Sequence, residues 1–414
     1  MFLPDQWPSY YERAEGACIW DLDGNKYIDM CISGVGACPL GYADPDVNAA
    51  VIDAVRRGSM STLNCPEEVE LAEVLCRLHP WAQMVRFART GGESMSVAVR
   101  IARAWTGRSQ VAFCGYHGWS DWYLAVNLVE SDALGSKGLL LSGLEPRGVP
   151  RELTGTAWGF RHNHLEELRD IVSKTGGNLA AIITEPQRGE RPTPEFLAGL
   201  RQIANETGAV LIFDEISAAM RLNTGGAHLL YGQSPDIAVF SKSIGNGFAI
   251  GAVIGKGEVM EAAQTTFLSS TYWTERVGPA AALATFRKHE ALNVPERLIH
   301  AGRRVQQVWK DESQKAGLAA EASHPEMPPL SHLVFKYPNA KAVQTLLCQM
   351  MLERGFLDNG NFYAMYAHTD EILDQYEAVV REVFPLLADA VQRQRVEALL
   401  KGPVSHSGFA RLTS

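Results

Sequence analysis

Two residues of this chain could act together on a carbonyl compound. Lys242 follows the apolar run Ile237–Phe240, and an amine in such a place can form a Schiff base with an aldehyde. Asp214 follows a second apolar run, Val210–Phe213, and its carboxylate could pair with a protonated ring nitrogen. An imine-forming lysine and an acid beside a ring nitrogen are the groups that pyridoxal phosphate (PLP) requires, because its protonated ring withdraws electrons from the substrate.

Each of these residues has another interpretation when it is considered alone. A lysine after a strand is usually a solvated strand end, and the acidic pair Asp214-Glu215 could cap a helix or bind magnesium, as in nucleotide-hydrolysing enzymes. A nucleotide-hydrolysing enzyme would need a Gly-Lys-Ser/Thr phosphate loop, which the sequence lacks.

A candidate phosphate site precedes both residues in the chain. Thr90, Gly91 and Gly92 form a glycine turn, and the apolar residues that follow recur at helical spacing. The N–H groups at the start of a helix bind anions, and glycines let a phosphate approach the backbone closely. The order of turn, acid and lysine therefore supports PLP much more strongly than any of the three alone.

The composition is that of an ordinary globular protein. The 414 residues are 46% hydrophobic and 21% charged, with a formal net charge of −9, which disfavours nucleic acid or a membrane as a partner. No apolar run is long enough to span a membrane, and the N-terminus lacks the pattern of a signal peptide. The seven cysteines include no Cys-x-x-Cys pair, so we expect reduced thiols in a cytoplasmic protein and no metal site.

Strands and helices alternate through the middle of the chain, which predicts an α/β fold. Near-continuous apolar runs predict strands buried on both faces, so we expect a large PLP-binding domain, residues 63–289, built on a mainly parallel sheet. Asp214 and Lys242 then lie at the carboxyl ends of strands, where ligands bind in such sheets. We expect residues 1–62, which include a hairpin around Asp23-Gly24, and residues 290–402 to form a small α+β domain from both termini, with a tail at 403–414.

Several motifs in this order resemble those of the class-III aminotransferases of the fold-type-I PLP superfamily, nearest the glutamate-1-semialdehyde aminomutase branch. The resemblance covers roughly residues 14 to 395. The matching segments are Gly16–Asp29, Arg86–Glu93, Gly115–Gly118, Thr184–Pro186, Phe213–Ile216 and Ser241–Lys242.

The resemblance implies a role for each site residue. Lys242 would carry the imine and Asp214 would contact the pyridine nitrogen, so these two are the expected catalytic residues. Thr271 would reach the phosphate of the neighbouring subunit, which implies a homodimer with shared active sites. The other residues implied in cofactor binding are Thr90, Gly91 and Gly92 at the phosphate, Tyr116 and Ile216 on the two ring faces, and His117, Glu185 and Ser217.

Three of these assignments keep a structural alternative. Tyr116 could belong to a packed aromatic loop, and a histidine such as His117 is more often a structural hydrogen-bonding residue. Glu185 could merely cap the next helix. Likewise, Arg188, Arg191 and Arg221 are either a solvated basic face or a fork for a substrate carboxylate.

Departures from the family pattern concern the phosphate and the substrate. The usual Ser-Gly-Thr turn is Thr90-Gly91-Gly92 here, which removes a hydroxyl from the phosphate site. Residues 270–276 replace a small turn with a bulky polar one, so we expect Trp273, Glu275 and Arg276 to wall the substrate pocket and residues 358–363 to add polar groups at its mouth.

These features predict an aminotransferase that moves an amino group from an amino-acid donor, glutamate, to a polar aldehyde or ketone such as a sugar-derived carbonyl. An intramolecular aminomutase is the alternative, but the stretch that carries a glutamate in that branch has none after Phe362. A non-catalytic binding protein of the same fold is a further alternative, and the presence of both Lys242 and Asp214 argues against it.

Overall fold

The computed structural model describes residues 2–4, 6–128 and 145–406, and the chain divides into two compact units. The larger unit comprises residues 46–187 and 191–288, and the smaller unit comprises residues 1–45, 188–190 and 289–414. Most of the expected tail, residues 407–414, lies outside the described residues. No helix in the described ranges combines the length and the apolarity that crossing a bilayer requires.

The larger unit is built on a seven-stranded sheet, as far as the described residues show. Its strand order is β4-β10-β9-β8-β7-β5-β6. Neighbouring strands from β9 to β6 run parallel, whereas β10 is antiparallel to both β4 and β9, which confirms the prediction of a mainly parallel sheet. The strands are β4 (Met84–Ala88), β5 (Gln110–Cys114), β6 (Ala157–Gly159), β7 (Leu179–Thr184), β8 (Val210–Asp214), β9 (Ile237–Phe240) and β10 (Gly251–Gly255).

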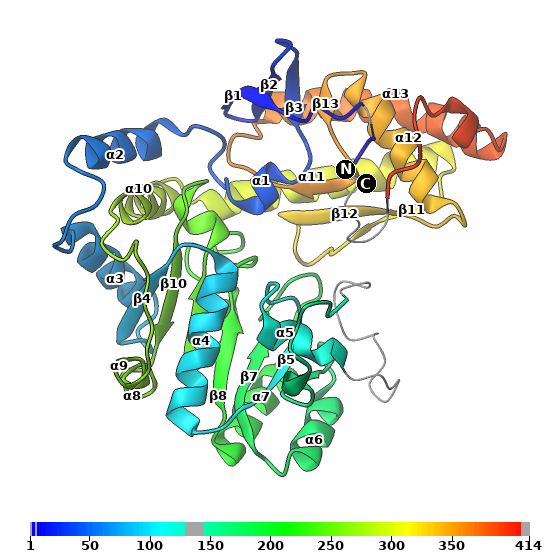
Figure 1. Cartoon of the computed structure of the whole chain (residues 1–414). Coiled ribbons are helices and arrows are strands. Elements are labelled where there is room, and N and C mark those ends of the chain that lie inside the picture. The colour runs from blue at the N-terminus through cyan, green and yellow to red at the C-terminus, as the bar shows by residue number, and fades with distance from the viewer. Residues whose placement is uncertain (1, 5, 129–144, 407–414) are drawn as a thin grey trace. The chain divides into compact units, whose positions relative to one another are not determined.

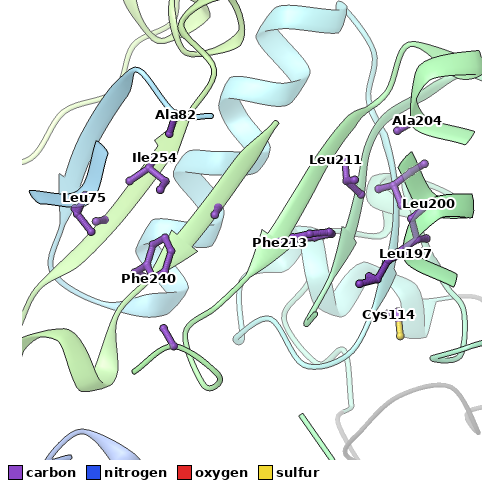
Figure 2. Packing of buried hydrophobic residues seen from close by; sticks show 14 of the residues in the cluster. Leu75, Ala82, Cys114, Leu197, Leu200, Ala204, Leu211, Phe213, Phe240 and Ile254 are labelled. Atoms are coloured by element: carbon purple, nitrogen blue, oxygen red, sulfur yellow. The ribbon is translucent and has the colours of Figure 1, made fainter. Parts of the chain in front are cut away.

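Helices cover both faces of this sheet, and Figure 1 shows α4 lying across it. Along β8, Leu211 and Phe213 pack with residues of α3, α6 and α7, while Val210 and Ile212 pack with residues of α4. Figure 2 shows the first of these two cores. The helices are α2 (Pro45–Arg56), α3 (Pro66–Leu78), α4 (Gly91–Thr106), α5 (Asp121–Leu124), α6 (Leu165–Lys174), α7 (Pro194–Thr207), α8 (Gly257–Met260), α9 (Ala262–Thr265) and α10 (Val277–Ala291).

Local signals in the sequence set the ends of the helix that leads into β8. The Thr193 hydroxyl caps the start of α7 by accepting the N–H of Phe196 at 3.1 Å, and Pro194 occupies the first helical position. Gly208 ends α7 with a φ of 69°, a left-handed conformation that glycine adopts without a Cβ clash. The chain then enters β8, which ends at Asp214.

The smaller unit combines two small sheets with long helices. One sheet has the order β1-β2-β3-β13 and the other has the order β11-β12-β14. The hairpin predicted around Asp23-Gly24 is confirmed, because β2 and β3 pair antiparallel on either side of it. The elements are β1 (Tyr11–Glu15), β2 (Cys18–Asp21), β3 (Lys26–Asp29), α1 (Ser33–Gly36), α11 (Val294–Ala316), β11 (Ala320–Ser323), β12 (Leu330–Phe335), α12 (Ala340–Leu352), β13 (Phe356–Leu357), β14 (Asn361–Tyr363) and α13 (Asp370–Gln392).

Asp358 lies in the core of the smaller unit, so the prediction that it lines a substrate mouth is wrong. Its carboxylate is 1% exposed and accepts the Tyr376 hydroxyl and the Gly360 N–H, both at 2.7 Å. Burial raises the pKa of Asp358 to about 6, against the lowering effect of these two donors. The side chain therefore acts as an internal acceptor that joins β13, β14 and α13.

Candidate active site

The expected catalytic lysine and acid stand at the ends of adjacent parallel strands. Asp214 is the last residue of β8 and lies opposite Val239 of β9, and Lys242 follows β9 by two residues. Lys242 has a φ of 47°, a left-handed conformation that is costly for a residue with a Cβ and is found most often at functional sites. Its Nζ donates a hydrogen bond to Ser217 Oγ at 2.7 Å, so the structure brings two of the predicted site residues together.

Asp214 is held by a buried histidine. The Nδ1 atom of His117 lies 2.7 Å from Asp214 Oδ2, and its Nε2 lies 3.1 Å from the carbonyl oxygen of Cys114. Both ring nitrogens therefore lie at hydrogen-bonding distance from an oxygen, one of the carboxylate and one of the backbone. The other oxygen of Asp214 accepts the Ile216 N–H at 3.0 Å. His117 thus fixes the orientation of the acid.

The glycine turn opens a helix, as the sequence predicts. Thr90 caps α4 by accepting the Glu93 N–H at 3.3 Å, which leaves the N–H groups of Gly91 and Gly92 at the positive end of the helix dipole. A Cβ on Gly91 would lie 2.9 Å from Cδ1 of Ile216, so Ile216 packs against a surface that only glycine provides. The Ile216 side chain therefore packs directly against the glycine turn.

Glu185 and Tyr116 meet at the ends of β7 and β5. Glu185 Oε2 accepts the Tyr116 N–H at 3.2 Å, and a Cβ on Gly115 would lie 2.7 Å from the same oxygen. The Gly115 φ of 115° also favours glycine at this point. The Tyr116 ring is half-buried and packs edge-on against Tyr123, with centroids 5.9 Å apart. Glu185 therefore positions the loop that carries Tyr116 and His117.

Thr271 is the one predicted site residue that stands apart from this group. It is exposed, in a turn that Arg89 holds through hydrogen bonds to the backbone carbonyl oxygens of Tyr272 and Glu275.

Two of the three residues expected to wall a substrate pocket have other partners in the structure. The Glu275 carboxylate caps α10 through the Val277 N–H at 2.5 Å, and the Arg276 guanidinium pairs with Glu67 at 3.1 Å. Both charges are therefore engaged within the larger unit, and their contact with substrate stays a prediction. The Arg86 guanidinium carbon lies 5.2 Å from the centroid of the Trp273 ring. Trp273 also lines a cavity of about 410 Å³ along the edge strand β4.

Arg221, left open between a solvated face and a carboxylate fork, is buried inside the larger unit. It is 1% exposed, and its Nε donates to the backbone carbonyl of Ser217 at 2.8 Å. This hydrogen bond therefore holds the segment that carries Ser217 from the interior of the larger unit.

A buried network behind the site was not predicted. Glu215 accepts the backbone N–H of His228 at 2.9 Å and lies 2.7 Å from its Nδ1, while Trp81 Nε1 donates to His228 Nε2 at 3.2 Å. An indole nitrogen only donates, so Nε2 of His228 is the acceptor of this hydrogen bond. The network ties the segment after Asp214 to α3 and the residues that follow it. The signal in the sequence is Glu215 itself. It directly follows Asp214, and successive side chains of an extended chain point to opposite sides.

The lysine is the nucleophile that the chemistry of the site favours. Cys114 also lies at a strand end here, but burial raises the pKa of its thiol to about 12, so it remains protonated near neutral pH. Three groups of the site, each after a different strand, match three groups of PLP. The Lys242 amine matches the aldehyde, the Asp214 carboxylate matches the ring nitrogen, and the start of α4 matches the phosphate. The donor set of the site therefore fits this cofactor.

Comparisons with known proteins agree with this geometry. The family model for class-III aminotransferases matches residues 4–320, and the chain belongs to this family. A 3-aminobutyryl-CoA aminotransferase of Cloacimonas acidaminovorans (strain Evry) is 30% identical over 92% of this chain and 90% of its own. A 2'-deamino-2'-hydroxyneamine transaminase of Streptomyces kanamyceticus is 30% identical over 92% of this chain and 93% of its own.

Solved structures show the same fold. The FumI protein of Sphingopyxis sp. MTA144, determined with PLP, has a TM-score of 0.84 at 26% identity and covers 97% of this chain and 92% of its own. A glutamate-1-semialdehyde aminomutase of Pseudomonas aeruginosa PAO1 has a TM-score of 0.78 at 21% identity, over 91% of this chain and 88% of its own. The protein is thus a PLP-dependent aminotransferase of fold type I.

Proposed function

We propose that this aminotransferase moves an amino group from an amino-acid donor, glutamate, to a polar aldehyde or ketone, such as a sugar-derived carbonyl compound. The observation that carries the catalytic part is the placement of Lys242 and Asp214 on adjacent strand ends, with His117 behind the acid. The hydroxylated acceptor is supported by the relative whose name refers to a hydroxyneamine, a substrate of aminoglycoside type.

In this proposal Lys242 has two tasks. Its Nζ would attach the cofactor, and once the donor amine has replaced it, the same nitrogen would accept the proton from the α-carbon of the substrate. Ser217 Oγ, 2.7 Å from Nζ, holds the amine in position. When bound, PLP supplies the electron-withdrawing ring that stabilises negative charge at this carbon.

Asp214 would hold the ring nitrogen of the cofactor. Its buried carboxylate would keep a proton on that nitrogen, and His117 would prevent the carboxylate from turning away. Gly91 and Gly92 would hold the phosphate through their N–H groups, with Thr90 capping the same helix. Tyr116 and Ile216 would cover the ring faces, and Glu185 fixes the Tyr116 loop.

A donor requirement distinguishes an aminotransferase from an aminomutase. We expect enzyme loaded with pyridoxamine phosphate to convert labelled glutamate-1-semialdehyde at most once per site, with further turnover only when glutamate restores the amino form. An aminotransferase releases its product between the half-reactions, so the donor is consumed in proportion to turnover. The measurement is label in product against equivalents of glutamate consumed. Multiple-turnover formation of 5-aminolevulinate without a donor would contradict the choice of aminotransferase.

We also propose that the enzyme is a homodimer. Large apolar side chains on two neighbouring segments of the larger unit are exposed: Met60, Leu63, Val69, Phe267 and Tyr272. Hydrogen bonds join the two segments, from Thr274 Oγ1 to the Ser61 carbonyl at 2.7 Å and from the Arg276 N–H to the Ser59 carbonyl at 2.9 Å. Exposed apolar side chains on two hydrogen-bonded segments favour association, and the exposed Thr271 lies on one of these segments.

Subunit complementation tests the shared site. A Lys242→Ala protein and a Thr271→Asp protein should each be nearly inactive, because one lacks the amine and the other puts a negative charge beside the phosphate. After unfolding and refolding together, about half of the dimers should be mixed and carry one intact site, so activity should return to about a quarter of wild type. The control is Lys242→Ala mixed with Lys242→Arg, which should recover nothing. Equal results in both mixtures would rule out the role of Thr271 across subunits.

For the cellular location we propose the cytoplasm. All seven cysteines are free in the structure, and five of them are buried. Reduced, buried thiols suit a reducing compartment.

A further inference from the structure

The loop after β5 lies against the first turn of α4. A Cβ on Gly118 would lie 3.3 Å from the Gly92 Cα, so the two backbones are nearly in contact. On the other side of Trp119, the Ser120 hydroxyl lies 2.9 Å from the Ser96 hydroxyl, which in turn donates to the Gly92 carbonyl at 3.0 Å. Both neighbours of Trp119 are therefore fixed to the start of α4.

The indole of Trp119 lies over Gly92. A Cβ on Gly92 would be 3.7 Å from Trp119 Nε1 and 3.9 Å from its Cδ1, so the polar edge of the ring faces this position. The indole N–H is a donor that cannot accept, and its hydrogen is fixed in the plane of the ring. Trp119 is 77% exposed, so its ring is accessible to a ligand from solvent.

The same position is where this chain departs from its family. In the family pattern that the sequence resembles, the phosphate turn ends in threonine, whose hydroxyl can donate to a phosphate, whereas this chain has Gly92, which has no side chain to do so. The space that a threonine side chain would enter is bordered by the indole N–H instead. The threonine hydroxyl is therefore absent from this chain, and the indole N–H of Trp119 lies beside the position that it would occupy.

We propose that Trp119 is a phosphate-binding residue whose indole N–H replaces the hydroxyl that Gly92 lacks. This inference rests on the proposed binding of the PLP phosphate at the start of α4. Trp119 would donate to the phosphate together with the N–H groups of Gly91 and Gly92. The glycine and the tryptophan are coupled, because a Cβ at position 92 would already be in van der Waals contact with the indole edge, and a longer side chain would share its space.

The first test compares a ligand with the phosphate and a ligand without it. Trp119→Phe keeps an aromatic ring and removes the N–H, so the dissociation constant of PLP from the full-length protein should rise about tenfold or more, the usual effect of losing a hydrogen bond to a charged group. The dissociation constant of pyridoxal, which has no phosphate, should change less than twofold. Equilibrium dialysis with absorbance detection measures both constants without catalytic turnover.

Trp105→Phe is the matched control. Trp105 is exposed like Trp119, at 48%, but it lies in α4 itself, 13 residues beyond Gly92 and about 20 Å along the helix. Its replacement should leave both constants unchanged. An equal loss of PLP and pyridoxal affinity in Trp119→Phe would show that the ring only covers the site, and no loss of either would show that it does not act there. Both results overturn the inference, whereas a wild-type protein that binds neither ligand would instead refute the proposed function.

The second test uses the dependence between the two positions. Gly92→Thr alone should weaken PLP binding at least tenfold, because the new side chain competes with the indole for one space. Combined with Trp119→Ala, which vacates that space, the same threonine can supply the hydroxyl of the family pattern. The double variant should therefore bind PLP more tightly than Trp119→Ala alone. A threonine that weakens binding equally in both backgrounds would contradict the replacement of one donor by the other.

Discussion

Lys242→Ala is expected to lower kcat by at least about 10⁴-fold, the upper range for loss of a positioned proton-transfer group. The variant loses both the amine that attaches the cofactor and the base that takes the α-proton, and Ser217, the partner of Nζ, cannot replace either. Steady-state rates with glutamate and a reactive aldehyde measure the loss. Borohydride treatment followed by peptide mass analysis should fix PLP to Lys242 in the wild type and to no residue in the variant.

Lys256→Ala is a suitable control for this result. Lys256 follows the neighbouring strand β10, and its amine pairs with Asp236 at 2.7 Å, so it tests the removal of a lysine beside the same sheet. Because Asp236 also forms an ion pair with Arg201 and accepts the Leu211 N–H, the variant should fold and keep kcat within about threefold, as expected for an ion pair that is partly exposed. Near-normal turnover in Lys242→Ala, or borohydride labelling elsewhere in the chain, would refute the assignment of the lysine.

The strand ends could be predicted from the sequence because parallel strands in such a fold are buried on both faces. Apolar runs such as Val210–Phe213 show where a strand lies, and the first polar residue after the run shows where it leaves the core. This local signal placed Asp214 and Lys242 on one edge of the sheet, and the structure shows them on adjacent strands. The glycine turn before α4 is predictable for the same reason, since its capping pattern is local.

The partners of polar side chains could not be predicted in this way, because they depend on which segments the fold brings together. Glu275 and Arg276 have the residue types of a substrate pocket, yet one caps α10 and the other pairs with Glu67. The hydrogen bond between His117 and Asp214 joins residues 97 positions apart. Trp119 is similar, since only the structure shows its indole edge facing Gly92. Spacing along the chain carries no information about such contacts.

Asp214→Ala should have the second largest effect, a loss of roughly 10²–10³-fold in kcat, or about 3–4 kcal/mol of transition-state stabilisation. Without the carboxylate, no group keeps the proton on the ring nitrogen, so negative charge at the substrate carbon is less well stabilised. The absorption of the bound cofactor should also become more sensitive to pH in the variant, which is a readout that a merely structural residue would not move. A kcat within threefold of wild type would refute the role of the acid.

His117 should act only through Asp214, and a double-mutant cycle can show this. His117→Phe removes the hydrogen bond at 2.7 Å and should lower kcat by about tenfold, because the free carboxylate can turn away from the ring nitrogen. In the Asp214→Ala background the same change should have almost no effect on kcat, since the group that it orients is already gone. His117→Asn, which can still donate to the acid, should retain more activity than His117→Phe. Additive losses in the double variant would mean that His117 contributes independently of Asp214, and the pair would then not function as a unit.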